Sequence, residues 1–278
     1  MERKKVQFTK MHGCGNNYIY VYLPDNPSFS LQQASIAWSR PAFGIGSDGL
    51  ITIDHSQVAD FQMRIFNNDG SEALMCGNGI RCCGKFVRDH GLTDKQEVTF
   101  ETLAGIKTVS LVEDSEGEVT AARVYMGVPT LENAQQFVPA QQVGEHLYQV
   151  GKYVGTYVCM GNPHFVIFVD DVMTIDLPDV GPRMEHHSAF PERCNVEFAQ
   201  VRKDGSIRMR VWERGSGITL ACGTGACATA VAAVLTQKCP RQNQIEMDGG
   251  TLTIEWQEDG SLYMTGPAQT VFTGEISI

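Results

Sequence analysis

The sequence lacks any long hydrophobic run. Its longest apolar stretch, residues 226–235, is far shorter than the roughly 20 residues needed to cross a bilayer, and it is rich in alanine. The basic residues at 3–5 are followed by polar ones such as Gln7 and Thr9, not by the apolar core of a secretory signal. We therefore expect a cytoplasmic protein with no membrane partner.

Features of a nucleic-acid or phosphate-loop protein are also missing. The chain carries 22 Lys and Arg against 32 Asp and Glu, a net charge of −10, and its basic residues cluster only at 3–5. Such a surface does not neutralise phosphates, so nucleic acid is not an expected partner. The glycine-rich stretch 215–225 is not followed by the Gly-Lys-Ser/Thr of a phosphate loop.

Cysteine is present without the spacing that disulfides or zinc require. There are nine cysteines, an odd number, and the sequence contains no Cys-x-x-Cys pair. We therefore expect free thiols, most of them buried as small apolar side chains, and no metal.

A repeat with an offset of 146 residues runs through the chain. Segments 64–76 and 210–222 both begin with Arg, an aliphatic and an aromatic residue, and both end in a Cys that Gly-x-Gly follows. Two further pairs fall in the same register ahead of apolar runs: Gly15-Asn16 with Gly161-Asn162, and Gly49 with Asn195. Three segments in one register indicate two copies of one module.

Each copy contains short runs rich in Val, Ile, Phe and Thr, which predict strands, for example at 98–103, 108–112, 123–126 and 252–256. Each has one clear helix, amphipathic over 79–89 and apolar on all sides, hence buried, over 226–235. We predict an α/β fold of the α+β type, in which a curved, mostly antiparallel sheet wraps around a central helix, twice. The N-terminal module would span 1–120, completed by 267–278, and the C-terminal module 121–266, with a ligand cleft between them.

The two Cys-Gly motifs, Cys76-Gly-Asn-Gly79 and Cys222-Gly-Thr-Gly225, each precede a predicted helix. The first amides of a helix lack internal partners and carry the positive end of the dipole, so they can bind a carboxylate and stabilise a thiolate. We also expect Asn78 and Thr224 to cap their helices.

One such motif alone would indicate a buried cysteine at a tight turn. Two copies related by a repeat predict two thiols on opposite sides of one point, which is what racemisation needs. One thiolate removes an α-proton, and one thiol delivers a proton to the opposite face.

Motifs along nearly the whole chain make the sequence resemble the diaminopimelate epimerases, which are amino-acid epimerases independent of pyridoxal phosphate. The motifs are Met11-His-Gly-Cys-Gly-Asn16, Gly44-Ile-Gly-Ser-Asp48, Arg64-Ile-Phe-Asn67, Asp69-Gly-Ser-Glu72, Cys76-Gly-Asn-Gly79, Gly161-Asn-Pro-His164, Asn195-Val196, Glu213-Arg-Gly215 and Ala221-Cys-Gly-Thr-Gly-Ala226.

The resemblance implies a role for each matching residue. Cys76 and Cys222 would be the acid/base pair, and His164 and Glu213 would be catalytic groups near the reacting amine. The substrate contacts would be Gly77, Asn78, Gly223 and Thr224 at the reacting carboxylate, Glu213 at the amine, Asn67, Asn162, Asn195 and Arg214 at the distal end, and Asn16. The resemblance further implies a small-molecule substrate, a homodimer, and neither cofactor nor metal.

The expected reaction interconverts LL- and meso-2,6-diaminopimelate for lysine and peptidoglycan precursor synthesis. Arg214 could meet the second carboxylate of this substrate with a two-pronged bond. One alternative is a racemase of another amino acid, such as histidine or proline, which would not need the Arg214 cluster. The other is a binding module that keeps the fold, which would not need two poised thiols.

Overall fold

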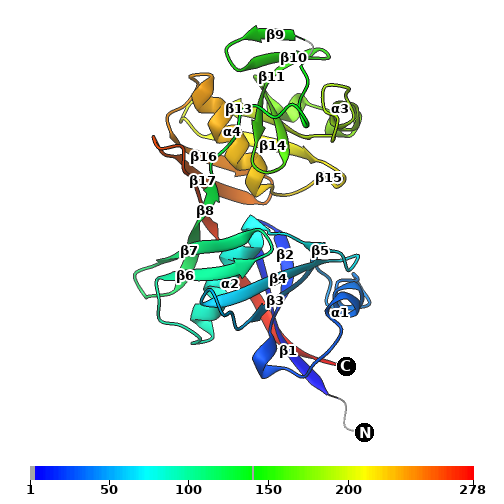
Figure 1. Ribbon diagram of the computed structural model, residues 1–278, viewed down its shortest axis with the longest axis vertical. Coiled ribbons are helices and arrows are strands. Elements are labelled where there is room, and N and C mark those ends of the chain that lie inside the picture. The colour runs from blue at the N-terminus through cyan, green and yellow to red at the C-terminus, as the bar shows by residue number, and fades with distance from the viewer. Residues whose placement is uncertain (1–3, 140) are drawn as a thin grey trace. The chain divides into compact units, whose positions relative to one another are not determined.

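A computed structural model describes residues 4–139 and 141–278 (Figure 1). The chain divides into two compact units. The first consists of Met1–Val124 together with Gly266–Ile278, and the second of Tyr125–Thr265.

The first unit is a mixed sheet with one helix against each face. Its elements are β1 (Lys5–Gly13), β2 (Asn16–Tyr22), η1 (Leu23–Asp25), α1 (Leu31–Trp38), β3 (Gly49–Asp54), β4 (Phe61–Asn67), β5 (Glu72–Ala73), α2 (Gly77–Asp89), β6 (Glu97–Thr102), β7 (Gly105–Glu113), the start of β8 (Val119–Gly127) and β19 (Gln269–Ser277). The neighbours β2–β3 and β4–β6 are parallel, whereas β19–β1–β2, β3–β4–β5 and β6–β7–β8 are antiparallel.

The second unit repeats this plan. Its elements are β9 (Gln141–Gly144), β10 (Leu147–Val150), β11 (Tyr153–Cys159), β12 (Pro163–Phe168), η2 (Val172–Thr174), α3 (Leu177–Glu185), β13 (Asn195–Val201), β14 (Ile207–Glu213), β15 (Gly217–Ile218), α4 (Gly223–Leu235), β16 (Gln242–Met247), β17 (Gly250–Trp256) and β18 (Leu262–Pro267). Here β12–β13 and β14–β16 are parallel, and β9–β10–β11–β12, β13–β14–β15 and β16–β17–β18 are antiparallel.

The offset of 146 residues holds at the level of single strand pairs. Leu50 lies opposite Phe66 in the first unit, and Val196 lies opposite Trp212 in the second. The parallel pairs obey the same offset, because Ile19 lies opposite Leu50 and Phe165 opposite Val196. Helices α2 and α4 are also displaced by 146 residues at both ends. The predicted α/β class is therefore confirmed, with one module built twice.

The central helices are buried against the sheets. Helix α2 contacts β1, β2 and β7, and α4 contacts β11, β12, β13, β16 and β17. The prediction that α4 is apolar and buried is confirmed. Helix α2 has the predicted amphipathic character, with Lys85, Arg88 and Asp89 on its more exposed side. It is more deeply buried than that pattern suggests, since residues 78–84 are all buried and even the side chain of Arg81 has no exposed area.

Each central helix begins close against a strand of its sheet. A Cβ atom on Gly79 would lie 2.6 Å from Cδ1 of Ile51 on β3, and one on Gly225 would lie 2.8 Å from Oε1 of Glu197 on β13. Only glycine fits at these two positions without a shift of the neighbouring side chain. The second glycine of each Cys-Gly-x-Gly motif thus sets how closely the first helical turn approaches the strand.

In the stretches that the structure describes, 4–139 and 141–278, none of the helices has both the length and the apolar character needed for a transmembrane span.

Candidate active site

The thiol of Cys76 caps helix α2. Cys76 is the N-cap residue, with extended backbone, and its Sγ accepts a hydrogen bond from the Gly79 amide at 3.4 Å. The prediction that Asn78 caps this helix is therefore wrong, since Asn78 lies inside the first turn. The sulfur itself faces the positive end of the helix, where a thiolate is stabilised.

Asn16, at the start of β2, connects Cys76 to the rest of the first unit. Its Oδ1 accepts from the Cys76 thiol at 3.3 Å and from the Asn78 amide at 3.4 Å. Its Nδ2 donates to Oδ2 of Asp48 at 2.9 Å, and the Asn17 backbone amide donates to the same oxygen. Asp48 therefore fixes the Asn16 amide in the orientation that presents an acceptor to the thiol.

The charge of Cys76 is governed by opposing effects. Burial raises the pKa of its thiol, while the amides of Gly79 and Asn78, the hydroxyl of Tyr18 and the positive charge of Arg81 act to lower it. Cys76 as a whole residue is half-buried.

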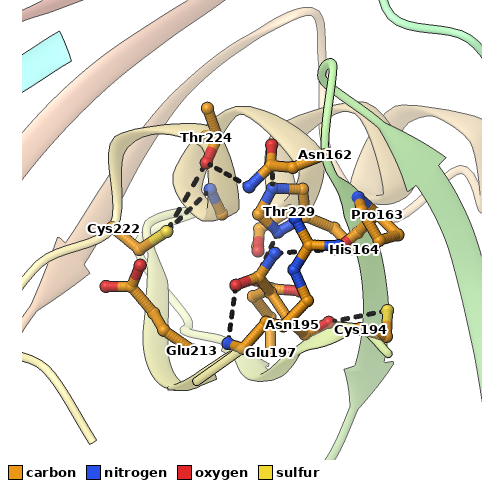
Figure 2. Close-up of polar contacts among 12 residues, drawn as sticks. Asn162, Pro163, His164, Cys194, Asn195, Glu197, Glu213, Cys222, Thr224 and Thr229 are labelled. Carbon is orange, nitrogen blue, oxygen red and sulfur yellow. Dashed lines mark hydrogen bonds and ion pairs between the residues drawn. The ribbon is translucent and has the colours of Figure 1, made fainter. Parts of the chain in front are cut away.

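Cys222 repeats this arrangement in the second unit. It caps α4, and its Sγ accepts from the Gly225 amide at 3.3 Å and lies 3.6 Å from Oγ1 of Thr224 (Figure 2). Thr224 is again not the cap, which overturns the second capping prediction. The Asn162 amide donates to Thr224 Oγ1 at 3.5 Å, so Asn162 contacts Thr224 as Asn16 contacts Asn78 in the first unit.

His164 on β12 and Glu197 on β13 form a buried pair near Cys222. Nδ1 of His164 lies 2.6 Å from Oε1 of Glu197, and Nε2 lies 3.1 Å from Oδ1 of Asn162. Neither side chain has any exposed area. The second oxygen of Glu197 is buried and has no hydrogen-bond partner among the described residues.

Glu213, at the end of β14, lies beside Cys222. Thr219 donates a short hydrogen bond to its Oε1, and Figure 2 shows its carboxylate next to the Cys222 sulfur. Burial raises the pKa of Glu213, against hydrogen bonds from Thr219 and Cys222 and the charge of His164. Burial, followed by Glu213 and Glu197, holds the pKa of the Cys222 thiol well above its usual range.

The raised pKa of Glu213 predicts a pH-dependent effect on stability. A carboxyl group with a raised pKa in the folded state contributes stability below its ordinary pKa and loses it as pH rises through the folded value. We expect Glu213→Gln to gain stability relative to the unmodified protein as pH rises from 4.5 to 8, by at most about 1.4 kcal/mol per pH unit. Urea unfolding across this range measures the difference.

Glu72→Gln is the matched control. The Arg64 guanidinium beside Glu72 lowers the pKa of that carboxyl, so the sign is opposite. A lowered pKa changes stability only below the ordinary value of 4.5, so this variant should lose stability relative to the unmodified protein as pH rises towards 4.5 and stay level from 4.5 to 8. Parallel behaviour of the two variants would contradict the assignment for Glu213.

Asn195 and Arg214 lie together in the second unit. The Asn195 amide donates to the Pro163 carbonyl at 2.8 Å, and its Oδ1 accepts from the Arg214 backbone amide at 2.9 Å. Asn195 thus holds the backbone that carries Arg214, whose guanidinium donates to the Glu192 carbonyl at 3.0 Å. Asn67 lies in the first unit at the end of β4, where its amide donates to Ser71 Oγ at 3.0 Å.

The structure thus groups the predicted residues in sets. Cys76, Gly77, Asn78 and Asn16 form one; Cys222, Gly223, Thr224, Asn162, His164 and Glu213 form a second; Asn195 and Arg214 form a third. Sequence reasoning missed Asp48, Arg81 and Glu197. Glu197 did leave a signal, because it is a lone charge inside the apolar strand 195–199.

No group of three or more His, Cys, Asp or Glu side chains able to hold a metal ion occurs among residues 4–139 and 141–278. The cysteines in this part of the chain are free thiols.

Comparison with known proteins gives matches over nearly the whole chain. A family model described as diaminopimelate epimerase matches residues 8–132 and 156–271. Diaminopimelate epimerases of Phocaeicola vulgatus and Bacteroides thetaiotaomicron are 56% and 54% identical to the chain. Each alignment covers 98% of this chain, and 99% and 98% of the respective relative.

Solved structures share the fold at low identity. A phenazine biosynthesis protein of the PhzF family from Bacillus anthracis matches with a TM-score of 0.72 at 16% identity, over 99% of this chain and 100% of that one. A hydroxyproline epimerase from Agrobacterium vitis matches with a TM-score of 0.67 at 13% identity, over 100% of this chain and 94% of that one. These two show the architecture alone, whereas the family model and the close relatives identify the chain as a member of the diaminopimelate epimerase family.

Proposed function

We propose that this protein is an isomerase that interconverts LL-2,6-diaminopimelate and meso-2,6-diaminopimelate, using Cys76 and Cys222 as its acid/base pair. The reaction serves the synthesis of lysine and peptidoglycan precursors and uses neither pyridoxal phosphate nor a metal. The observation that carries the proposal is the duplicated cap: two thiols, 146 residues apart, each accept a hydrogen bond from the third amide of a buried helix.

The duplication suits a reaction that inverts one carbon. A thiolate removes the α-proton, the C–H bond breaks, and its electron pair passes into the adjoining carboxylate. The second thiol gives its proton to the opposite face, which forms the new C–H bond. The two cysteines end with their protonation states exchanged, and exchange with solvent restores them.

The carboxylate gains charge as the proton leaves. The amides of the first turns of α2 and α4, at Gly77, Asn78, Gly223 and Thr224, are the groups we assign to it. Preorganised donors of this kind stabilise charge that develops in a transition state. Asn16, which contacts both Cys76 and Asn78, and Asn162, which contacts Thr224, would fix the same end of the substrate.

The remaining roles follow from the resemblance of the sequence to the family. We assign Glu213, beside Cys222, and His164 to the amine at the reacting carbon. We assign Arg214, with Asn67, Asn162 and Asn195, to the distal amino-acid end. Because Asn195 holds the Arg214 backbone, it would act on that end through the arginine as well.

Solvent deuterium exchange tests the proposal. The purified protein, with reductant and without added cofactor, is incubated in heavy water with LL-diaminopimelate. We expect deuterium at one α-carbon as the meso form accumulates, measured by NMR and mass spectrometry.

Two other outcomes would each replace the proposal. Exchange into histidine or proline, with none into diaminopimelate, would indicate a racemase of another amino acid. Absence of exchange into any amino acid would favour a binding module that retains the fold.

The cellular setting forms part of the same proposal. We assign the protein to the cytoplasm and to a homodimer, both on the resemblance of its sequence to the family. The net charge of −10 supports a small-molecule ligand over nucleic acid. Light scattering at known concentration tests the dimer, and a monomer mass would contradict it.

A further inference from the structure

Cys76 and Cys222 occupy corresponding positions of the repeat, but the charged residues around the two thiols differ. The position of Arg81 in α2 corresponds to Cys227 in α4, and the position of Glu197 on β13 corresponds to Ile51 on β3. A buried cation thus belongs to the Cys76 half, and a buried carboxylate belongs to the Cys222 half. If the two units had kept the same residues after duplication, both thiols would have the same charged neighbours.

The side chain of Arg81 lies under the first turn of α2 with no exposed area. Its guanidinium donates to the Gly77 carbonyl at 3.2 Å, to Asn78 Oδ1 at 2.9 Å and to the Pro267 carbonyl at 3.3 Å. It therefore ties together the two residues that follow Cys76. A planar, permanently charged fork is suited to holding several oxygens at once.

The chain makes room for this side chain at Gly13. A Cβ atom there would lie 2.8 Å from Nη2 of Arg81 and 3.1 Å from the Asn78 carbonyl oxygen. The corresponding position in the second unit is Cys159, which has a side chain and no arginine to accommodate. Gly13 and Arg81 therefore form a structural pair that has no counterpart at the corresponding positions of the second unit, Cys159 and Cys227.

We propose that Arg81 is a positioning residue for Cys76: it fixes the first turn of α2 and so makes Cys76 the resting thiolate. Glu197 and Glu213 keep Cys222 in the thiol form. The inference deepens the proposed epimerase function and rests on it, because a two-thiol mechanism needs one sulfur in each protonation state before substrate binds.

The other groups around the sulfurs agree with this division. Cys76 faces the phenols of Tyr18 and Tyr20 on β2, with Asp48 behind Asn16, and Cys82 and Cys83 on its own helix. These are neutral except for Asp48, whose Oδ2 accepts hydrogen bonds from Asn16 and Asn17. Cys222 faces two carboxyl groups, Glu213 and Glu197, and the His164 ring. Burial raises the pKa of both thiols; Arg81 opposes that rise at Cys76, and the carboxyl groups reinforce it at Cys222.

The test measures each thiol separately in the full-length protein without substrate. Iodoacetamide alkylation is followed against pH, and peptide mass spectrometry distinguishes Cys76 from Cys222. Since the thiolate is the reacting form, the midpoint of each profile reports its ionisation. We expect Cys76 to have the lower midpoint.

Arg81→Met should raise the Cys76 midpoint by about one pH unit or more, which slows alkylation at neutral pH about tenfold. The Cys222 midpoint should not change. Arg81→Lys, which keeps the charge without the fork, should shift the Cys76 midpoint less than Arg81→Met does. Arg88→Met is the matched control, because Arg88 lies at the far end of α2 and pairs with Glu113; it should leave both midpoints unchanged.

An unchanged Cys76 midpoint in Arg81→Met with a normal melting curve would overturn the proposal. If Arg81→Met does not fold, Gly13→Ala displaces the guanidinium without removing it and should also raise the Cys76 midpoint. No movement there would equally overturn it. Because alkylation needs no substrate, failure of the epimerase proposal shows in deuterium exchange alone, and failure of the Arg81 proposal shows in the midpoints.

Discussion

Replacing either capping cysteine, as Cys76→Ala or Cys222→Ala, should lower kcat/KM for epimerisation by about 10³-fold or more. Each variant lacks one of the two groups that must act on opposite faces of the α-carbon, and general acid–base groups contribute effects of this size. The measurement is formation of meso-diaminopimelate from the LL isomer. Cys83→Ala is the control: this thiol is fully buried in the same helix, so its loss should cost packing and leave kcat unchanged.

The two alanine variants should also differ from one another. Each retains one thiol, which can remove the proton from one face and return a deuteron to that same face. We therefore expect one variant to exchange deuterium into the LL isomer and the other into the meso form, both without inversion. Full epimerase activity in either variant would end the two-thiol mechanism.

The second large effect is expected at the His164–Glu197 pair. His164→Ala removes the partner of a carboxyl group that has no exposed area and whose other oxygen has no partner among the described residues. Removing one member of such a buried pair costs about 3–5 kcal/mol of unfolding free energy. Glu197→Gln should cost less, because its amide oxygen can still accept from the ring. Urea unfolding measures both.

The double variant completes the cycle. His164→Ala with Glu197→Gln leaves no buried charge, so it should be more stable than the sum of the single losses predicts. Residues in direct contact show coupling well above about 0.5 kcal/mol, the range within which independent sites add. Additive losses would show that the two side chains do not act as a pair.

The repeat carried most of what could be predicted about the fold. Its register predicts the two central helices and the strands around them, and it places Cys76 and Cys222 at matched positions. This worked because glycine and the capping position are local requirements: the first turn of each helix must approach its strand, and Gly79 and Gly225 permit that.

The repeat does not predict the buried charged residues near the thiols, Arg81 and Glu197. In the sequence Arg81 lies on a helix that pattern alone marks as amphipathic, and only three-dimensional partners explain its burial. The sequence predicts Asn78 and Thr224 as the caps, which is wrong, because cysteine is not among the residues that usually cap helices. The role of Glu197 depends on its pairing with His164, which lies on the neighbouring parallel strand but is distant in the sequence.

The last strand of the chain belongs to the first unit. In Figure 1, β19 (red) runs beside β1 (blue), and the two are paired from Lys5 with Ser277 through His12 with Gln269. During synthesis, the second unit is complete once residue 265 has emerged, but β1 has no partner on this edge until residues 269–277 have also emerged. The unit that begins first is therefore finished last. The ends also meet, since the Ile278 amide donates to the Lys4 carbonyl at 2.9 Å. A short linker could join them, and new termini could then be opened elsewhere in the chain.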